Sequence, residues 1–259
     1  MTDRQEQQRR LILDQFTRQA VPFAEMPAHS NDEANRLLID RTRIGPTDTV
    51  LDVACGPGLV ACTVAQTARY VTGIDLTPAM IEQARARQKT MGLTNLTWLV
   101  GDAVPLPLPD ASFSVVVTRY SMHHFLDPKA VLAEMARVCQ PEGRIAVIDV
   151  FTSSPDQAEA YNRVEKLRDP SHVRALSLEE LTDLCHDVKL RDVQSGFYKL
   201  DVQLEKLLAS SFPNPGDDAR IRQTFEKDIG VNRLGVGACR KDGAIHFAFP
   251  IVVITGQKR

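Results

Sequence analysis

The residues with the clearest chemical potential are three aspartates, each placed where a short apolar run ends. Asp52, Asp75 and Asp102 close or follow the runs 48–53, 70–75 and 96–100. In an open α/β sheet the carboxyl ends of parallel strands lie at one edge, where ligands bind. Carboxylates gathered there would accept hydrogen bonds from hydroxyl or amino groups and attract positive charge. The pattern therefore predicts a ligand site at that edge.

A glycine-containing loop follows the first of these runs. Gly56 and Gly58 stand one residue apart, before an apolar helix predicted over 59–68. Strand, glycine loop and helix are typical of nucleotide-binding α/β folds, and with Ala61 the spacing fits the relaxed dinucleotide fingerprint. Asp52 argues against a pyrophosphate, because like charges a few Å apart cost about 1 kcal/mol or more even near a surface. A cofactor carrying an ammonium and a sulfonium would instead be attracted.

Asp52-x-x-x-Gly56-x-Gly58 resembles the first motif of the class I S-adenosylmethionine-dependent methyltransferases. That family usually has a further glycine where this chain has Ala54. The stretch 137–144 resembles the family's helix-turn-strand signature. His123-His124-Phe125 is similar to a tripeptide of the ubiquinone and menaquinone C-methyltransferase-like branch, methyltransferase type 11. The resemblance covers residues 45–150 well and the remainder only in outline.

The resemblance implies S-adenosyl-L-methionine as cofactor. Asp75 would accept hydrogen bonds from the ribose hydroxyls and Asp102 from the adenine amino group. Met80 would pack on the adenine, although a methionine at helical spacing is equally typical of a core. Arg119 would offer its backbone to the amino-acid end of the cofactor, or its side chain to Asp52. The expected cofactor-binding residues are Asp52, Ala54, Gly56, Asp75, Leu76, Met80, Asp102, Ala103 and Arg119.

His123 and His124 are the candidates for catalysis, because they follow the strand predicted over 114–118. Adjacent side chains on an extended segment point opposite ways, so we expect at most one to face the site. Either could act as a general base, which is needed only if the acceptor must lose a proton. His124 could instead contact the cofactor or support the loop. The substrate-contact candidates are Phe23, His172, Arg174 and Tyr198, each of which could also belong to the core.

Alternating strands and helices are expected to position these residues. Further strands are predicted over 144–150, over 188–198 with an interruption at Gly196, and over 245–255, where Pro250 implies an edge or bulge. Residues 21–30 are expected to be irregular. Other helices are predicted over 1–20, 31–43 with Asn31 or Asp32 as cap, 78–91 after Thr77 as cap, 127–139, 155–167, 178–186, 202–212 and 217–229.

The expected fold class is α/β, and the resemblance implies a Rossmann-like, seven-stranded, mostly parallel sheet. Helices would cover both faces, and a helical cap would be inserted before the last strands. Residues 1–44 would form an N-terminal helical segment over the cofactor site. The α/β core would comprise 45–151, 187–200 and 245–259, and the substrate cap 152–186 and 201–244. We expect this cap to be a mobile roof that selects a small, partly apolar acceptor.

Composition narrows the class of protein further. A net charge of −2 with interleaved acids and bases argues against a nucleic-acid binder, and no apolar run is long enough to span a membrane. The polar start lacks a signal core, and 5 cysteines without a Cys-x-x-Cys pair favour free thiols in a reducing cytosol. No histidine, cysteine or carboxylate group has metal-ligand spacing, so no catalytic metal is expected.

The sequence therefore predicts a cytoplasmic S-adenosylmethionine-dependent methyltransferase acting on a small-molecule acceptor. The identity of the acceptor, the methylated atom and homodimer formation stay open. The alternatives are an enzyme of the same fold that binds the cofactor without methylating, a NAD-dependent oxidoreductase, and a regulatory module that senses the cofactor.

Overall fold

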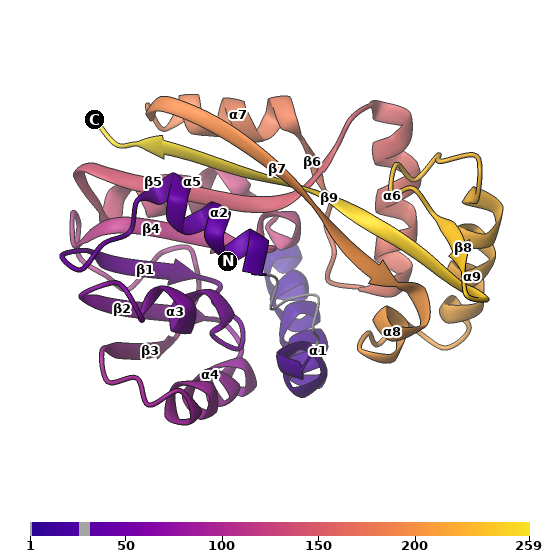
Figure 1. Ribbon diagram of the computed structural model, residues 1–259, viewed down its shortest axis with the longest axis horizontal. Coiled ribbons are helices and arrows are strands. Elements are labelled where there is room, and N and C mark those ends of the chain that lie inside the picture. Colours follow the sequence, from indigo (N-terminus) through magenta and orange to yellow (C-terminus); the bar gives the residue numbers. More distant parts are fainter. Residues whose placement is uncertain (1, 26–31) are drawn as a thin grey trace.

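The computed structural model describes residues 2–25 and 32–259, and its centre is one twisted sheet (Figure 1). The strand order is β3-β2-β1-β4-β5-β9-β7, with β6 paired to β5 and β8 to β9. The strands are β1 Thr49–Val53, β2 Tyr70–Asp75, β3 Leu96–Val100, β4 Phe113–Arg119, β5 Cys139–Thr152, β6 Leu176–Ser177, β7 Arg191–Gln203, β8 Cys239–Lys241 and β9 Ala244–Gln257.

The first five strands of this path are parallel, β9 runs in the opposite direction, and β7 again runs with the first five. β1 pairs with β2 and β4, β2 with β3, and β4 with β5, all in parallel. β9 lies antiparallel between β5 and β7. This order confirms the expected α/β class and its mostly parallel sheet. The short strands β6 and β8 are added to the seven that were expected.

Helices cover both faces of the sheet, as the alternation of buried side chains along β1 requires. Val50 belongs to the cluster beneath α2 and α3, whereas Leu51 and Val53 belong to the cluster beneath α5 and α7. The helices are α1 Asp3–Glu25, α2 Asp32–Thr42, α3 Leu59–Val64, α4 Pro78–Thr90, α5 Pro128–Val138, α6 Pro155–Arg168, α7 Leu178–Asp187, α8 Leu204–Ala209 and α9 Asp217–Asp228, with a 3-10 turn η2 at Met122–His124.

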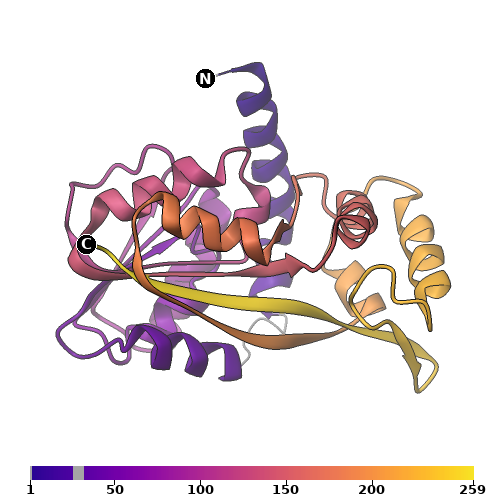
Figure 2. The ribbon, with the colours of Figure 1, turned by 90° about the horizontal axis from the view of Figure 1, so that it is seen from above.

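β7 and β9 run on beyond the parallel strands and carry a second group of helices, α6, α8 and α9 (Figures 1 and 2). Phe225 of α9 packs on Phe247 of β9, with ring centroids 4.6 Å apart. α7 does not belong to this group, because Leu181 and Cys185 are buried in the cluster with α5. α7 thus covers the core sheet, whereas the sequence placed it in the cap.

Several local expectations were wrong for identifiable reasons. α1 continues through Pro22 to Glu25, where an irregular segment was expected. β7 passes through Gly196 without interruption, and its register irregularity lies between Arg191 and Gln194 instead. A Cβ at Gly196 would come within 3.1 Å of the Arg41 guanidinium, so this glycine serves close packing. β7 also extends to Gln203, which delays the start of α8 to Leu204.

Other expectations about helix and strand ends can be checked in the same way. β9 pairs with β5 from Ile251 to Gln257, and Pro250 directly precedes this paired stretch. Its missing N–H therefore costs no hydrogen bond to β5. Thr77 precedes α4, but its side chain makes no capping hydrogen bond. The expected cap Asn31 lies outside the described residues.

Candidate active site

A cavity of about 510 Å³ opens at the carboxyl ends of the parallel strands. The structure brings together there all of the residues that the sequence assigned to cofactor binding. They are Asp52, Ala54, Gly56, Asp75, Leu76, Met80, Asp102, Ala103 and Arg119. Met80 is both 1% exposed and part of the cavity wall, so it serves the core and the site together.

The loop after β1 needs glycine at two positions for different reasons. Gly56 has φ +52°, and a Cβ there would meet no atom of the described residues within 4 Å, so these residues leave space beside it for a ligand. Gly58 has φ +74°, and a Cβ would come within 2.7 Å of the Trp98 ring. Ala54 also has a positive φ of 54°. That conformation is costly for alanine and explains the family's preference for glycine there.

Asp75 ties the glycine loop to the start of α4. Its two carboxylate oxygens accept hydrogen bonds from the Gly56 and Thr77 N–H groups, each at 2.8 Å. Burial raises the pKa of Asp75, while these two hydrogen bonds lower it. Each oxygen keeps a lone pair for a further donor, so the carboxylate can hold the loop and still accept from a ligand.

Asp52 is a buried carboxyl group at the floor of the cavity. Burial raises its pKa to about 7, while the positive charge of Arg119 and a hydrogen bond from the Ala61 N–H oppose that rise. One carboxylate oxygen lies 3.1 Å from the Ala61 nitrogen. The group is therefore poised near neutrality, and a bound cation would favour its ionised form.

Helix α1 stands across the carboxyl ends of the strands (Figures 1 and 2), and its side chains form one wall of the cavity. Arg9 forms an ion pair with Asp102, with a nitrogen–oxygen distance of 3.0 Å. Gln8 donates hydrogen bonds to the carbonyl oxygens of His124 and Ser171, at 2.9 and 2.7 Å. Sequence reasoning expected a covering segment but did not find Gln8 or Arg9, because a polar helix face carries no signal of the partner that it meets.

A smaller cavity of about 90 Å³ adjoins the first, and the two share Phe16, Phe23, Tyr120 and His124. Its other walls come from α1, η2, β5, β7, β9, α6, α8 and the loops that follow α6 and α8. They are Gln19, His123, Asp149, Val150, Tyr161, Glu165, Arg168, Asp169, Leu200, Leu207, Ser210, Ser211, Phe249 and Ile251. Of the expected substrate contacts, Phe23 lies here.

Both catalytic candidates line this smaller cavity, whereas only His124 also lines the large one. His123 and His124 lie on a 3-10 turn rather than an extended segment, and their ring centroids are 4.3 Å apart. Nδ1 of His123 lies 2.6 Å from the Asp149 carboxylate, which is 1% exposed. Burial alone would lower the pKa of His123, but Asp149 outweighs it and raises that pKa.

His124 has the opposite electrostatic character. Burial, together with the neighbouring His123, lowers its pKa to about 4, so the ring is neutral at physiological pH. Nδ1 of His124 faces the carbonyl and hydroxyl oxygens of Ser171, at 3.2 and 3.1 Å. The pKa values of these two adjacent histidines are thus shifted in opposite directions, because only His123 forms an ion pair with a carboxylate.

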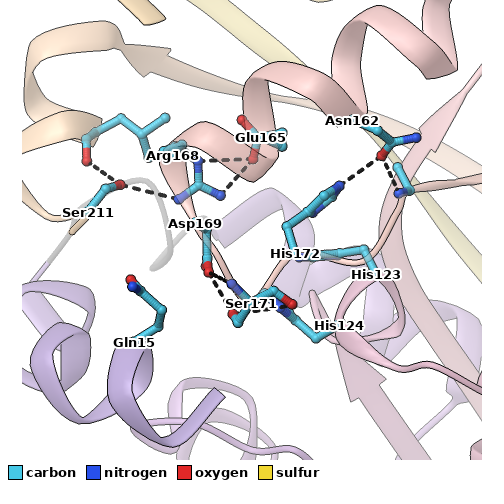
Figure 3. Close-up of polar contacts among 12 residues, drawn as sticks. Gln15, His123, His124, Asn162, Glu165, Arg168, Asp169, Ser171, His172 and Ser211 are labelled. Carbon is cyan, nitrogen blue, oxygen red and sulfur yellow. Dashed lines mark hydrogen bonds and ion pairs between the residues drawn. The ribbon is translucent and has the colours of Figure 1, made fainter. Parts of the chain in front are cut away.

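The remaining substrate candidates line neither cavity. Tyr198 contacts the wall residue Tyr120, and their hydroxyl groups form a hydrogen bond of 2.6 Å. His172 is buried against His123, and its Nε2 donates to the Asn162 side-chain oxygen at 2.8 Å (Figure 3). Arg174 is exposed and forms an ion pair with Glu180 at the start of α7. Arg174 is therefore corrected to a surface residue.

Residues 51–147 match the family described as a methyltransferase domain. The uncharacterized methyltransferase YcgJ of Bacillus subtilis is 28% identical over 242 residues, which cover 87% of this chain and 94% of YcgJ. The crystal structure of YcgJ superposes with a TM-score of 0.81 at 27% identity and covers 88% of this chain and 99% of YcgJ.

Two other solved structures share the fold at lower identity. A Bacillus halodurans protein has a TM-score of 0.77 at 23% identity and covers 87% of this chain and 99% of its own. The [4+2]-cyclase SpnF has a TM-score of 0.61 at 21% identity and covers 88% of this chain and 81% of its own.

Residues 51–147 are thus a methyltransferase domain, and most of the chain is similar to proteins named as methyltransferases. The chain is therefore an enzyme of the methyltransferase class. No helix within the described ranges is long and apolar enough to cross a bilayer. All five cysteines are free thiols. Across residues 2–25 and 32–259, no cluster of three or more potential ligand side chains could hold a metal ion.

Proposed function

We propose that this protein binds S-adenosyl-L-methionine in the large cavity and transfers its methyl group to a small molecule held in the adjoining small one. The observation that carries this proposal is the convergence of Asp52, Asp75 and Asp102 with an open glycine loop on one cavity. The second cavity meets the first at Tyr120 and His124, which is the arrangement that a two-substrate transfer needs.

The residues present fit this cofactor. Asp75 keeps lone pairs for the ribose hydroxyls, and the open space beside Gly56 lets the backbone approach the ligand. Asp102 would accept from the adenine amino group after Arg9 releases it. Asp52 and the backbone near Arg119 would face the charged amino-acid end. A nicotinamide dinucleotide would bring its pyrophosphate toward Asp52, which disfavours that alternative.

When bound, the cofactor supplies a methyl group on a sulfonium, already activated for displacement. The contribution of the chain is then largely positional, because alignment of the reacting atoms within about 3–3.5 Å supplies much of the acceleration. The aromatic walls of the small cavity would displace part of the water around a bound acceptor. If the acceptor must lose a proton, Nε2 of His123 is the group that would take it, since Asp149 accepts the proton on Nδ1.

The size and composition of the small cavity support a small, partly apolar acceptor. Its walls combine aromatic rings with a few polar groups, as enclosed ligand pockets do. A net charge of −2 does not favour nucleic acid. Among the solved neighbours, which share only the fold, is a geranyl diphosphate methyltransferase, whose substrate is also a small molecule.

Two measurements on the purified protein test the proposal. Isothermal titration calorimetry should show binding of S-adenosylmethionine and S-adenosylhomocysteine, with much weaker binding of NAD. A panel of small acceptors should then be screened for S-adenosylhomocysteine release. Failure of the folded protein to bind the cofactor would contradict the assignment. Binding without release for any acceptor would favour the non-methylating alternative.

A further inference from the structure

The small cavity contains a buried group of charged side chains whose charges do not cancel (Figure 3). Two carboxylates have clear partners. Glu165 holds the Arg168 guanidinium through two hydrogen bonds of 2.6 and 3.0 Å, and Arg168 also donates to the Ser211 hydroxyl at 3.2 Å. Asp149 is paired with His123, as described above. Asp169, the third carboxylate of the cavity wall, has no such partner.

Asp169 is 2% exposed, yet the described part of the chain forms no ion pair with it. One oxygen accepts hydrogen bonds from the N–H and the hydroxyl of Ser171, at 2.9 and 2.6 Å. The second oxygen accepts none from residues 2–25 and 32–259. Buried carboxylates are almost always paired, because an isolated charge is costly away from water. The missing partner of Asp169 points to a ligand.

The groups around Asp169 favour its ionised form, but none of the described ones forms an ion pair with it. Burial alone would raise the pKa of Asp169, but His124, Arg168 and the two hydrogen bonds from Ser171 lower it, so the carboxyl group is ionised at neutral pH. His124 is neutral there, since its own pKa is about 4. The guanidinium of Arg168 is already held by Glu165 and Ser211.

Aromatic rings form the rest of the wall. Phe16, Phe23, Tyr120, Tyr161 and Phe249 all line the cavity. Ring faces attract an ammonium group, and the attraction grows when the site is shielded from water. An anionic ligand would find the same rings but would face Asp169. A neutral ligand would leave its charge unpaired.

We propose that the small cavity recognises an acceptor that carries an ammonium group, with the free oxygen of Asp169 as its counter-charge and the aromatic rings as its walls. This inference rests on the proposed function, because it treats the cavity as the acceptor subsite. The inference is that the ammonium group of the acceptor is recognised, and it does not depend on which atom of the acceptor is methylated.

Three probes of similar size and different charge test the inference. Benzylamine, benzyl alcohol and benzoate should each be titrated into protein saturated with S-adenosylhomocysteine, with binding followed by ligand-observed NMR. Benzylamine should bind at least about tenfold more tightly than benzyl alcohol, as expected for a charge-assisted contact, and benzoate should not bind. Equal or tighter binding of benzoate would overturn the inference, and so would a failure of benzylamine to bind.

Asp169→Asn supplies the decisive variant, because its side-chain oxygen can still accept from Ser171 while the charge is lost. It should weaken benzylamine binding about tenfold and leave benzyl alcohol within about twofold. Asp156→Asn removes the same charge from an exposed site at the start of α6 and should change neither. An unchanged benzylamine affinity in Asp169→Asn would contradict the assignment of Asp169.

The same samples separate this inference from the proposed function. Binding of S-adenosylhomocysteine is measured first, by calorimetry, for the wild type and both variants. If the wild type does not bind it, the proposed function fails. If binding is intact and the amine preference is absent, only the ammonium inference fails.

Discussion

The two cavities are built in different ways, although they share the side chains of Phe16, Phe23, Tyr120 and His124. The large cavity takes its floor from β1 to β4 and the loops that follow them, within residues 52–131, and α1 supplies its side wall. The small cavity takes its walls from α1, η2, β5, α6, β7, the α8 region and β9. One site is a property of a single run of βα units, and the other exists only after distant segments have packed together.

Because of this difference, we expect cofactor specificity and acceptor specificity to reside in different parts of the chain. Backbone groups and strand-end carboxylates dominate the large cavity, so it suits a ligand that is common to a whole family. Side chains from the second half of the chain dominate the small cavity, so it suits a ligand that is particular to this chain. Substitutions in the large cavity should alter cofactor binding. Substitutions in the small cavity should alter the binding of the acceptor or its loss of a proton.

The largest expected effect comes from Asp75→Ala. The variant loses both hydrogen bonds from the Gly56 and Thr77 N–H groups and, on the proposed function, the contacts to the ribose. Cofactor binding should weaken by about 2–3 kcal/mol, measured by calorimetry with S-adenosylhomocysteine. Asp40→Ala, at an exposed position on α2, is the control. If Asp75→Ala binds S-adenosylhomocysteine with wild-type affinity, Asp75 does not contact the cofactor.

A somewhat smaller effect should follow from pH through Asp52, whose pKa is about 7 in the ligand-free protein. A cationic cofactor prefers the ionised carboxylate, so affinity should fall as pH drops through this value. Between pH 8 and pH 6 the loss should be about tenfold for one group of this pKa. In Asp52→Asn this component should vanish. The same pH dependence in wild type and variant would assign the titration to another group.

Asp149→Asn should act on the small cavity alone. The variant removes the charge that raises the pKa of His123, so that pKa should fall toward and below its ordinary value. Titration of the histidine ring resonances by NMR measures this shift. Binding of S-adenosylhomocysteine should stay close to that of the wild type. A clear loss of affinity for S-adenosylhomocysteine in Asp149→Asn would mean that the small cavity cannot be altered independently of the large one.

The smallest effect is expected at the surface of the large cavity, where Arg9 pairs with Asp102. Both side chains are about two-fifths exposed, so the ion pair contributes at most about 1 kcal/mol. Because Arg9 competes with the adenine for Asp102, Arg9→Ala should strengthen cofactor binding by no more than about threefold. Arg10→Ala breaks the matching exposed pair with Glu6 on the same helix and should have no effect. Weaker binding in Arg9→Ala would mean that Arg9 contacts the cofactor directly.

The sequence alone was enough to predict the strands of the first half and the edge of the sheet at which ligands meet them. Apolar runs ending in Asp52 and Asp75 identify strands whose carboxyl ends must lie together, and β2 and β3 begin and end where they were predicted. A turn with positive φ at Gly56 and Gly58 needs glycine whatever surrounds it. These features are local, since each depends on residues a few positions apart, and local features can be recognised in a sequence.

The small cavity and its charges were decided only by the tertiary structure. His123 and His124 face one space because a 3-10 turn replaces an extended segment, and Asp149 reaches His123 from a neighbouring strand. α1 meets the second half of the chain through Gln15, which donates to the carbonyl oxygen of Phe212, 197 residues away. Arg174, a candidate by residue type, turns out to face Glu180 on the surface. Contacts over such separations depend on the packing of whole elements, which residue type and spacing do not encode.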